Sequence, residues 1–269
     1  MTFVSSKAEA VRIQEIANKL ISEYPKPEIL SIFTKITNCK EQEIFMECVG
    51  INKEDGEMSY NKQVVDMYHA RYARTCTNWA LENGFLVDRE LTDYAERLIQ
   101  AYYEEQEKLA ITTLLLARVG KKEHTFSDKD GSFIETELNE KNLLKAYAKI
   151  NRYKDANGLI IGAKPKTLVV YESLRFVAYD LIKTINDRYA LKLNVAVVSK
   201  LPTLVEVTDW FIITDVSNVL MYCIGKDIYS DCNVKEDTKN IVLEVKGEYA
   251  FVALNPNCLF YAKGVSVDE

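Results

Sequence analysis

Histidine is almost absent from this chain of 269 residues, in which His69 and His124 are the only two. That scarcity excludes a histidine-rich metal site and a chain of histidine proton relays. Glycine is also scarce, at 10 residues, so there is little material for loops that wrap phosphate groups. The motifs Gly-x-Gly-x-x-Gly, Gly-x-Ser-x-Gly and His-Glu-x-x-His do not occur. The sequence therefore carries no recognisable catalytic signature.

No Cys-x-x-Cys pair occurs either, which excludes zinc ribbons and thioredoxin-like sites. The six cysteines are Cys39, Cys48, Cys76, Cys223, Cys232 and Cys258. Because no secretory signal opens the sequence and a chain of this length needs no disulfide staples, we expect free thiols in a reducing cytoplasm. No window approaches the roughly 18 uninterrupted apolar residues of a membrane span, so we expect no membrane partner.

Positive charge is in short supply, since 34 basic side chains oppose 40 acidic ones and the net charge is −6. An acidic protein does not track phosphate backbones over a broad surface, because that binding depends on Lys and Arg. Residues 1–40 hold six basic and four acidic side chains, whereas residues 41–92 hold five basic and ten acidic ones. The excess negative charge is thus concentrated in the second of these segments.

Two segments superficially suggest chemistry. Residues 158–167 resemble a phosphate loop, but their glycines are one residue too close for the Walker pattern, and Pro165 blocks helix initiation in the required register. We therefore expect a turn that leads into a strand. Glu104, Glu105 and Glu107 would suit a metal, but no Glu-x-x-His set accompanies them, which favours a solvated helix face.

The other candidates are histidines and aromatic residues. No nucleophile or ligand set is spaced around His69 or His124, so both are interpreted as surface histidines. Tyr68, Tyr72 and Trp79 would suit base stacking, but their acidic surroundings favour packing against a neighbouring surface. The sequence therefore predicts no catalytic, cofactor-binding or metal-ligating residue.

Hydrophobic periodicity predicts an α+β protein, with helices mainly in the first half and strands mainly in the second. The predicted helices cover residues 5–24, a short segment through 29–36, 92–118, 140–153 and 172–187. The predicted strands cover residues 44–51, 63–77, 167–170, 195–198, 210–214, 219–224, 240–246 and 250–254, with a polar loop over 123–138.

Three of these features lack a partner within the chain. Residues 1–40 form a mildly basic arm, and the strands 44–51 and 63–77 form a hairpin that cannot bury both of its faces alone. The helix over 92–118 would be about 40 Å long at 1.5 Å per residue, which is long for a compact domain of this size. These features predict a protein that completes its packing in other subunits.

The C-terminal half carries three motifs in a familiar order. They are Lys164-Pro-Lys-Thr-Leu-Val-Val170, Asp209-Trp-Phe-Ile-Ile-Thr-Asp215 and Gly247-Glu-Tyr-Ala-Phe-Val-Ala-Leu-Asn-Pro-Asn-Cys-Leu-Phe260. They resemble the "PKTLVV" segment, the "aWYLLaD" strand and the closing "G-x-x-V-x-x-P-x-A-F" strand pair of tailed-bacteriophage major capsid proteins. The closest likeness is to the branch that contains the Mu-like major head subunits, and it covers roughly residues 60–265.

The resemblance implies the Hong Kong 97-type capsid fold and a division of the chain. Residues 1–44 would be the N-terminal arm and residues 45–88 the extended E-loop. The peripheral domain would take residues 89–155 and 236–269, with a spine helix at 92–118, and the axial domain would take residues 156–235. The expected inter-subunit contact is the E-loop tip, which consists of Lys53, Glu54, Asp55, Gly56 and Glu57.

A member of that family is a viral structural protein, without enzyme activity or cofactor, that assembles itself into pentamers and hexamers of an icosahedral head. The resemblance implies scaffolding and portal proteins as partners, and a shell that encloses double-stranded DNA without binding a specific sequence. It also implies assembly in the bacterial host cytoplasm and a final place in the virion capsid.

Three alternatives stay open at the level of sequence. An encapsulin-like cellular compartment would have the same fold but hold enzyme cargo. A small α+β nucleotide-binding enzyme would be a monomer or small oligomer with a pocket. A tail or connector protein would form rings or tubes.

Overall fold

The computed structural model describes residues 6–51, 58–83, 87–118, 124–130, 132–155, 157–216 and 220–265. Its helices are α1 (Ser6–Glu23), the 3-10 turn η1 (Glu28–Ile32), α2 (Asn78–Glu82), α3 (Asp88–Arg118), α4 (Glu140–Ile150), η3 (Glu172–Leu174), α5 (Arg175–Tyr189) and η4 (Pro256–Cys258). Its strands are β1 (Thr34–Thr37), β2 (Gln42–Ile51), β3 (Met58–Asp66), β4 (Tyr68–Cys76), β5 (Pro165–Tyr171), β6 (Asn194–Val198), β7 (Trp210–Thr214), β8 (Leu220–Val234), β9 (Ile241–Ala253) and β10 (Leu259–Ala262). The predicted α+β class is confirmed.

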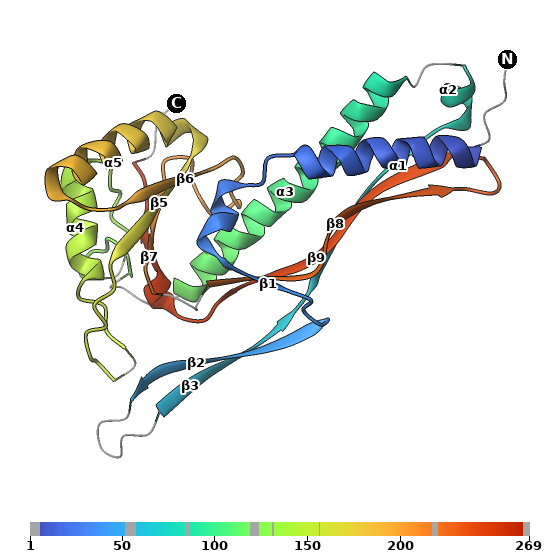
Figure 1. Ribbon diagram of the computed structural model, residues 1–269. Helices are drawn as coiled ribbons and strands as arrows, with labels where there is room; N and C mark the ends of the chain where they lie inside the picture. The colour runs from blue at the N-terminus through green and yellow to red at the C-terminus, as the bar shows by residue number, and fades with distance from the viewer. Residues whose placement is uncertain are drawn as a thin grey trace.

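The larger sheet has the strand order β1-β8-β9-β4 and follows the long dimension of the molecule (Figure 1). β1 runs parallel to β8, whereas β8 and β4 both pair antiparallel with β9. α1 lies along β8, α3 crosses β9 and β4, and the two helices contact each other. Their apolar stripes, which include Ile13, Ile99 and Tyr102, are thereby buried in one core with the sheet.

The smaller sheet has the strand order β10-β7-β5-β6. β5, α5 and β6 form a βαβ unit with parallel strands, and β7 and β10 add antiparallel to β5. α4 and α5 contribute Leu143, Ile150 and Ile182 to a second core, where they pack with Trp210 and Phe260. The opposite face of this sheet joins the core of the larger sheet, which explains why its strands are apolar throughout.

The two sheets divide the chain differently from the ranges that the resemblance implies. α4 lies within residues 89–155 and β10 within 236–269, yet both pack with the smaller sheet. β8 lies within 156–235 but pairs with β9 along most of its length, and so belongs to the larger sheet. Strand pairing and core packing together define two parts. One part consists of α4, α5, β5, β6, β7 and β10, and the other consists of α1, α3, β1, β4, β8 and β9.

β2 and β3 form a separate antiparallel hairpin that projects from the body (Figure 1). The strand predicted over 44–51 is confirmed within β2. The strand predicted over 63–77 is in fact two, because the chain leaves the hairpin at Met67 and enters the larger sheet as β4. The Met67 N–H donates to Glu41 O at 2.9 Å, which closes the base of the hairpin. The turn predicted at 52–57 lies outside the described residues.

Other element boundaries also differ from those predicted. α3 begins at Asp88, before the predicted start at residue 92, so Thr92 lies inside the helix, where its Oγ1 donates to Asp88 O at 2.7 Å. The short helix predicted through 29–36 is η1 followed by β1, because Ile36 pairs with Cys223 of β8. The strand predicted to end at 224 continues to Val234 in β8. α1, α4 and α5 confirm the helices predicted in their regions.

β9 is one continuous strand, whereas the sequence predicted two strands separated around Gly247. Gly247 makes no turn, since it pairs with Ala70 of β4 in regular register. Its missing side chain serves instead to let α3 pass close to the sheet. The glycine therefore marks a close approach of two elements within a continuous strand.

Candidate assembly surfaces

The outward face of the β2–β3 hairpin exposes apolar side chains. Ile44 of β2 stands directly opposite Val64 of β3, and the two residues are 56% and 49% exposed. Met46, two residues along β2, is 64% exposed. Phe45 and Val65 alternate to the other face and pack against the main core. Ile44, Met46 and Val64 thus form an apolar strip on the solvent side, called here the hairpin strip.

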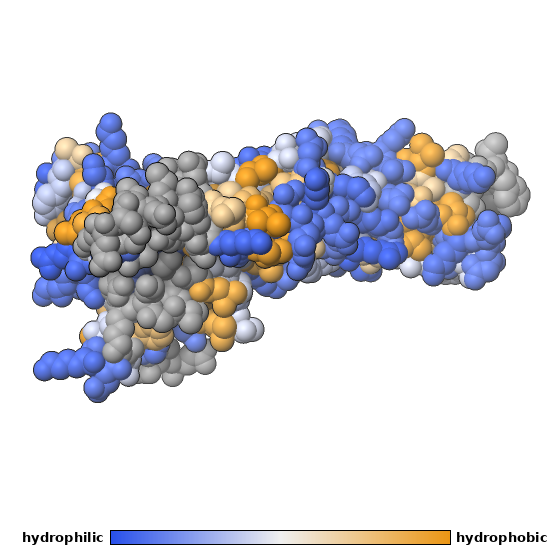
Figure 2. Space-filling view, turned by 90° about the horizontal axis from the view of Figure 1, so that it is seen from below, coloured by the Kyte–Doolittle hydropathy of each residue, from blue (hydrophilic) through white to orange (hydrophobic). Residues whose placement is uncertain are grey.

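The base of the hairpin is fastened by polar contacts. Gln42 Nε2 donates to Asp66 Oδ1 across the two strands at 2.8 Å, and the Lys40 N–H donates to Glu43 Oε1 at 2.7 Å. A two-stranded sheet is marginal in water by itself. Figure 2 views the molecule from the side on which the hairpin projects, and it shows hydrophobic side chains beside the grey atoms and mainly hydrophilic ones along the body. The hairpin strip therefore lies where a neighbouring molecule can cover it.

A second apolar area lies where α5 begins. Phe176 of α5 and Leu204 in the loop after β6 are 80% and 83% exposed. Ser173 Oγ donates to Val207 O at 3.1 Å, which ties the start of α5 to that loop. Val207 is itself about half exposed. Apolar side chains gathered on neighbouring surface segments are typical of interaction sites.

Two carboxylates fasten the smaller sheet to the rest of the chain. Oε2 of Glu107, on α3, accepts hydrogen bonds from Ser199 N, Ser199 Oγ and Lys200 N at 3.0, 2.7 and 2.9 Å. A carboxylate oxygen of Glu28, on η1, accepts from Val197 N at 2.8 Å and so covers the free edge of β6. Burial raises the pKa of Glu107, although its hydrogen bonds act in the other direction. η1 and α3 therefore both hold the end of β6.

The prediction of a solvated glutamate face on α3 is wrong for Glu107, which is buried. Glu104 and Glu105 are half-buried and lie 3.6 and 3.7 Å from the ammonium groups of Lys200 and Lys108. The three carboxylates hence do not converge on one point. Among the residues that the structure describes, no group of three or more His, Cys, Asp or Glu side chains could hold a metal ion.

The two histidines have different surroundings. His69 is exposed, as predicted, and its Nδ1 lies 3.8 Å from Glu248. His124 is buried, so its interpretation as a surface residue is wrong. Its ring stacks on that of Tyr153 with the centroids 4.2 Å apart. No pattern in the sequence indicates this contact.

The remaining residues singled out in the sequence have structural surroundings. Tyr68 packs edge-on against Tyr249, with the ring centroids 5.5 Å apart. Gly158 and Gly162 have φ of +79° and +68°, which confirms a turn before β5. The described thiols of Cys39, Cys76, Cys223, Cys232 and Cys258 are free, as predicted. None of the described helices has the length and apolar character needed to cross a bilayer.

No family model matches the sequence, and no curated protein matches it. Solved structures do match the fold. The virus-like particle from Pyrococcus furiosus aligns over 94% of this chain and 98% of that chain, with a TM-score of 0.62 and 11% identity. Mycobacterium phage Cain aligns over 91% and 92%, with a TM-score of 0.63 and 13% identity. The capsid of a native GTA particle aligns over 89% and 90%, with a TM-score of 0.56 and 7% identity.

The chain therefore has the Hong Kong 97-type capsid fold that its motifs imply. At identities this low the likeness is one of fold, and it extends over nearly the whole length of each chain. The Mu-like branch stays a prediction.

Proposed function

We propose that this chain is the major capsid protein of a tailed bacteriophage, which assembles itself into the pentamers and hexamers of an icosahedral head. The hairpin strip carries the proposal. Ile44, Met46 and Val64 lie exposed on a two-stranded sheet, and no described segment of the chain covers them. A second copy that covers this face would bury the apolar surface that the hairpin leaves in water.

In this proposal the β2–β3 hairpin is the E-loop, the part built on the larger sheet is the peripheral domain, and the part built on the smaller sheet is the axial domain. The tip residues Lys53, Glu54, Asp55, Gly56 and Glu57 lie outside the described residues, and their role as an inter-subunit contact is proposed from the sequence. Residues 41–92 hold ten acidic and five basic side chains. We therefore expect a basic surface on the neighbour that receives the E-loop.

The head would enclose double-stranded DNA and would be built in the bacterial cytoplasm with scaffolding and portal proteins. The net charge of −6 supports a shell that contains DNA without gripping it at specific sites. The proposed role is geometric and needs no catalytic step. Each subunit contributes a packed body and a projecting hairpin that is completed by its neighbour.

Size-exclusion chromatography followed by negative-stain electron microscopy tests the proposal. We expect closed, megadalton shells when the full chain is produced together with the other head proteins of its source. Open rings or tubes would instead identify a tail or connector protein. A monomer that stays unassembled under those conditions and binds a nucleotide would identify a small enzyme.

Charge reversal at the tip tests the E-loop contact separately. Glu54→Lys, Asp55→Lys and Glu57→Lys together should impair assembly while the subunit stays folded by circular dichroism. The matched control reverses three other acidic residues, Glu15, Glu236 and Asp237, of which Glu15 lies on α1 and the others follow β8. Intact particles from the tip variant would contradict the proposed contact.

The second candidate is an encapsulin-like compartment. It is favoured by one observation, that the TM-score to the virus-like particle from Pyrococcus furiosus, 0.62, lies within 0.01 of that to Mycobacterium phage Cain, 0.63. Chemical identification of the contents separates the two. Packaged genomic DNA supports the phage head, whereas enzyme cargo supports the compartment.

A further inference from the structure

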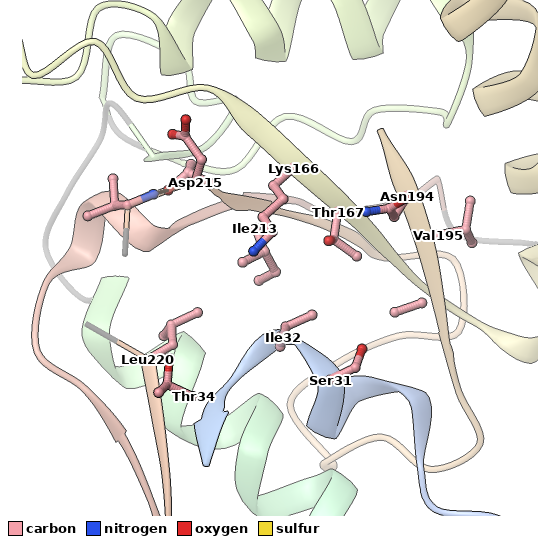
Figure 3. A pocket seen from close by; sticks show the side chains of 13 residues that line it. Ser31, Ile32, Thr34, Lys166, Thr167, Asn194, Val195, Ile213, Asp215 and Leu220 are labelled. Carbon is pink, nitrogen blue, oxygen red and sulfur yellow. Dashed lines mark hydrogen bonds between the residues drawn. The ribbon is translucent and has the colours of Figure 1, made fainter. Parts of the chain in front are cut away.

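A cavity of about 240 Å³ lies between the arm and the smaller sheet. One wall consists of η1 and β1, and the other consists of β5, β6 and β7 (Figure 3). The cavity therefore sits at the junction of two parts of the fold. Cavities of this kind are the usual places for small ligands when polar groups converge in them.

Lys166 supplies a cation to this cavity. β5 carries an extra residue here, because Pro165 pairs with Thr214 and Thr167 with Ile213, which leaves Lys166 in a bulge. A bulge re-aims a side chain relative to the regular alternation of a strand. Figure 3 shows the Lys166 side chain directed into the hollow, and its ammonium group makes no ion pair with any described residue.

Thr167 supplies a hydroxyl beside that cation. The residue is only 6% exposed. Its Oγ1 is not one of the fully buried polar atoms that lack a partner in the described part of the chain, so this oxygen is open to the cavity. In Figure 3 this hydroxyl is directed into the hollow, next to Lys166. A hydroxyl that faces the cavity can donate to a molecule bound there.

Further polar groups line both walls. Asn194 pairs with Thr167 in the β5–β6 register, and Thr34 of β1 lines the opposite wall. The Ser31 hydroxyl donates to Glu28 O at 2.7 Å, and its oxygen faces the hollow (Figure 3). Asp215, the one carboxylate among the described lining residues, turns away from the hollow in Figure 3 and accepts a hydrogen bond from Lys164 N at 2.8 Å.

We propose that this cavity binds a small phosphate-type oxyanion that bridges the arm and the smaller sheet. A tetrahedral anion accepts hydrogen bonds from several directions. It can therefore accept from the ammonium of Lys166 and from the hydroxyls of Thr167 and Thr34, which lie on different walls of the cavity. Lysine binds phosphate as a point charge, without the planar fork that arginine offers to carboxylates. The bound anion would hold η1 and β5 together.

The cavity favours a free phosphate over the backbone of a nucleic acid. Its walls come from both parts of the fold, and the described lining residues offer a single cation, whereas a polymer needs a tract of them. Inorganic phosphate and a short DNA duplex are therefore the two probes to compare, with acetate as a planar anion of the same sign.

The test is calorimetric titration of the full-length protein with inorganic phosphate at constant ionic strength, repeated for three variants. Lys166→Met and Thr167→Val should each weaken phosphate binding, the first by about tenfold or more, because a charge-assisted hydrogen bond is lost. Lys164→Met is the matched control, since it makes the same change two residues away on a side chain outside the lining, and should leave the affinity unchanged.

Three results would overturn the proposal. The first is a phosphate affinity of Lys166→Met equal to that of the wild type. The second is a loss of phosphate affinity in Lys164→Met as large as that in Lys166→Met. The third is binding of duplex DNA or acetate as tight as that of phosphate. A phosphate-dependent rise in the midpoint of thermal unfolding, present in wild type and lost in Lys166→Met, supports it independently. Because Lys166 is exposed, its substitution leaves the fold intact, which circular dichroism verifies.

Discussion

The ring of Tyr102 lies directly over the backbone of Gly247, where α3 crosses β9. A Cβ atom at position 247 would come within 2.3 Å of Tyr102 Oη and 2.9 Å of two ring carbons. Tyr102 is buried and packs edge-on against Tyr249 with the ring centroids 5.5 Å apart, so its ring has little room to retreat. The distance between α3 and the larger sheet therefore depends on the absence of a side chain at one strand position.

Gly247→Ala should lower the free energy of unfolding by about 2 kcal/mol, because the added methyl overpacks a filled core. Denaturant unfolding of the unassembled subunit measures the loss. Gly225→Ala is the control, since its Cβ would have nearest neighbours at 3.1 to 3.4 Å, two of them in the Glu248 side chain. Equal losses in the two variants would show that strand glycine in general, and not the contact with Tyr102, is responsible.

Glu107 is a buried carboxylate whose ionisation opposes folding. Burial raises its pKa above the ordinary value of 4.5. A raised folded-state pKa contributes stability that is fully present below the unfolded value and is lost as pH rises through the folded value. Relative to Glu107→Gln, the wild type should therefore gain stability as pH is lowered from 7 toward 4.5.

The amide oxygen of Glu107→Gln can still accept from Ser199 and Lys200, because all three bonds converge on one oxygen. The free energy of unfolding of this variant at pH 7 should equal or exceed that of the wild type. Glu107→Ala should lose about 2 kcal/mol, since it leaves buried donors unpaired. Urea unfolding at several pH values measures both. A wild type that loses stability relative to Glu107→Gln on acidification would refute the assignment.

Glu244 of β9 is buried like Glu107, but its contribution to stability depends on pH in the opposite direction. Burial alone would raise its pKa, but hydrogen bonds from Lys246 and Arg71 overcome that effect and lower it. A lowered pKa contributes stability above the unfolded value that is lost as pH falls through the folded value. Relative to Glu244→Gln, the wild type should be more stable by about 1 to 2 kcal/mol at pH 7. This advantage should shrink below about pH 4.5, as urea unfolding would show. An advantage that persists undiminished at pH 3 would exclude a role for the charge.

The difference between these two glutamates is invisible in the sequence. Glu107 follows Glu104 and Glu105 in a polar stretch of α3, yet it is the one that is buried. Only the register of β4 against β9 brings Arg71 near Glu244, from which it is 173 residues apart in the sequence. The sequence did predict what depends on local periodicity, namely α1, α3 and the strands β5, β6 and β7 of the smaller sheet, but it predicted no strand at β10. It failed where tertiary contacts override local signals, as at Gly247 and at the buried His124.

The hairpin shows the same limit within the candidate site. Its polar turn made the hairpin predictable. β2 is apolar at Ile44, Phe45 and Met46 in succession, so no alternation indicates which side is buried. The tertiary structure decides which face of the hairpin is buried. Phe45 and Val65 pack on the main core, whereas Ile44 and Val64 are exposed to solvent. Register within the fold, not composition, decides what the hairpin offers to a partner.

Ile44→Thr combined with Val64→Thr should weaken assembly and leave the subunit folded. Thr keeps the β-branch that suits a strand but replaces apolar contact by a hydroxyl, which costs about 1 kcal/mol at each buried position. Two such losses per subunit weaken each contact by roughly thirtyfold, and the critical concentration for assembly, measured by sedimentation, should rise accordingly. Val11→Thr on α1 is the control, because Val11 is as exposed as Ile44, at 56%. Assembly of the hairpin variant at the wild-type concentration would show that this face of the hairpin is not an interface.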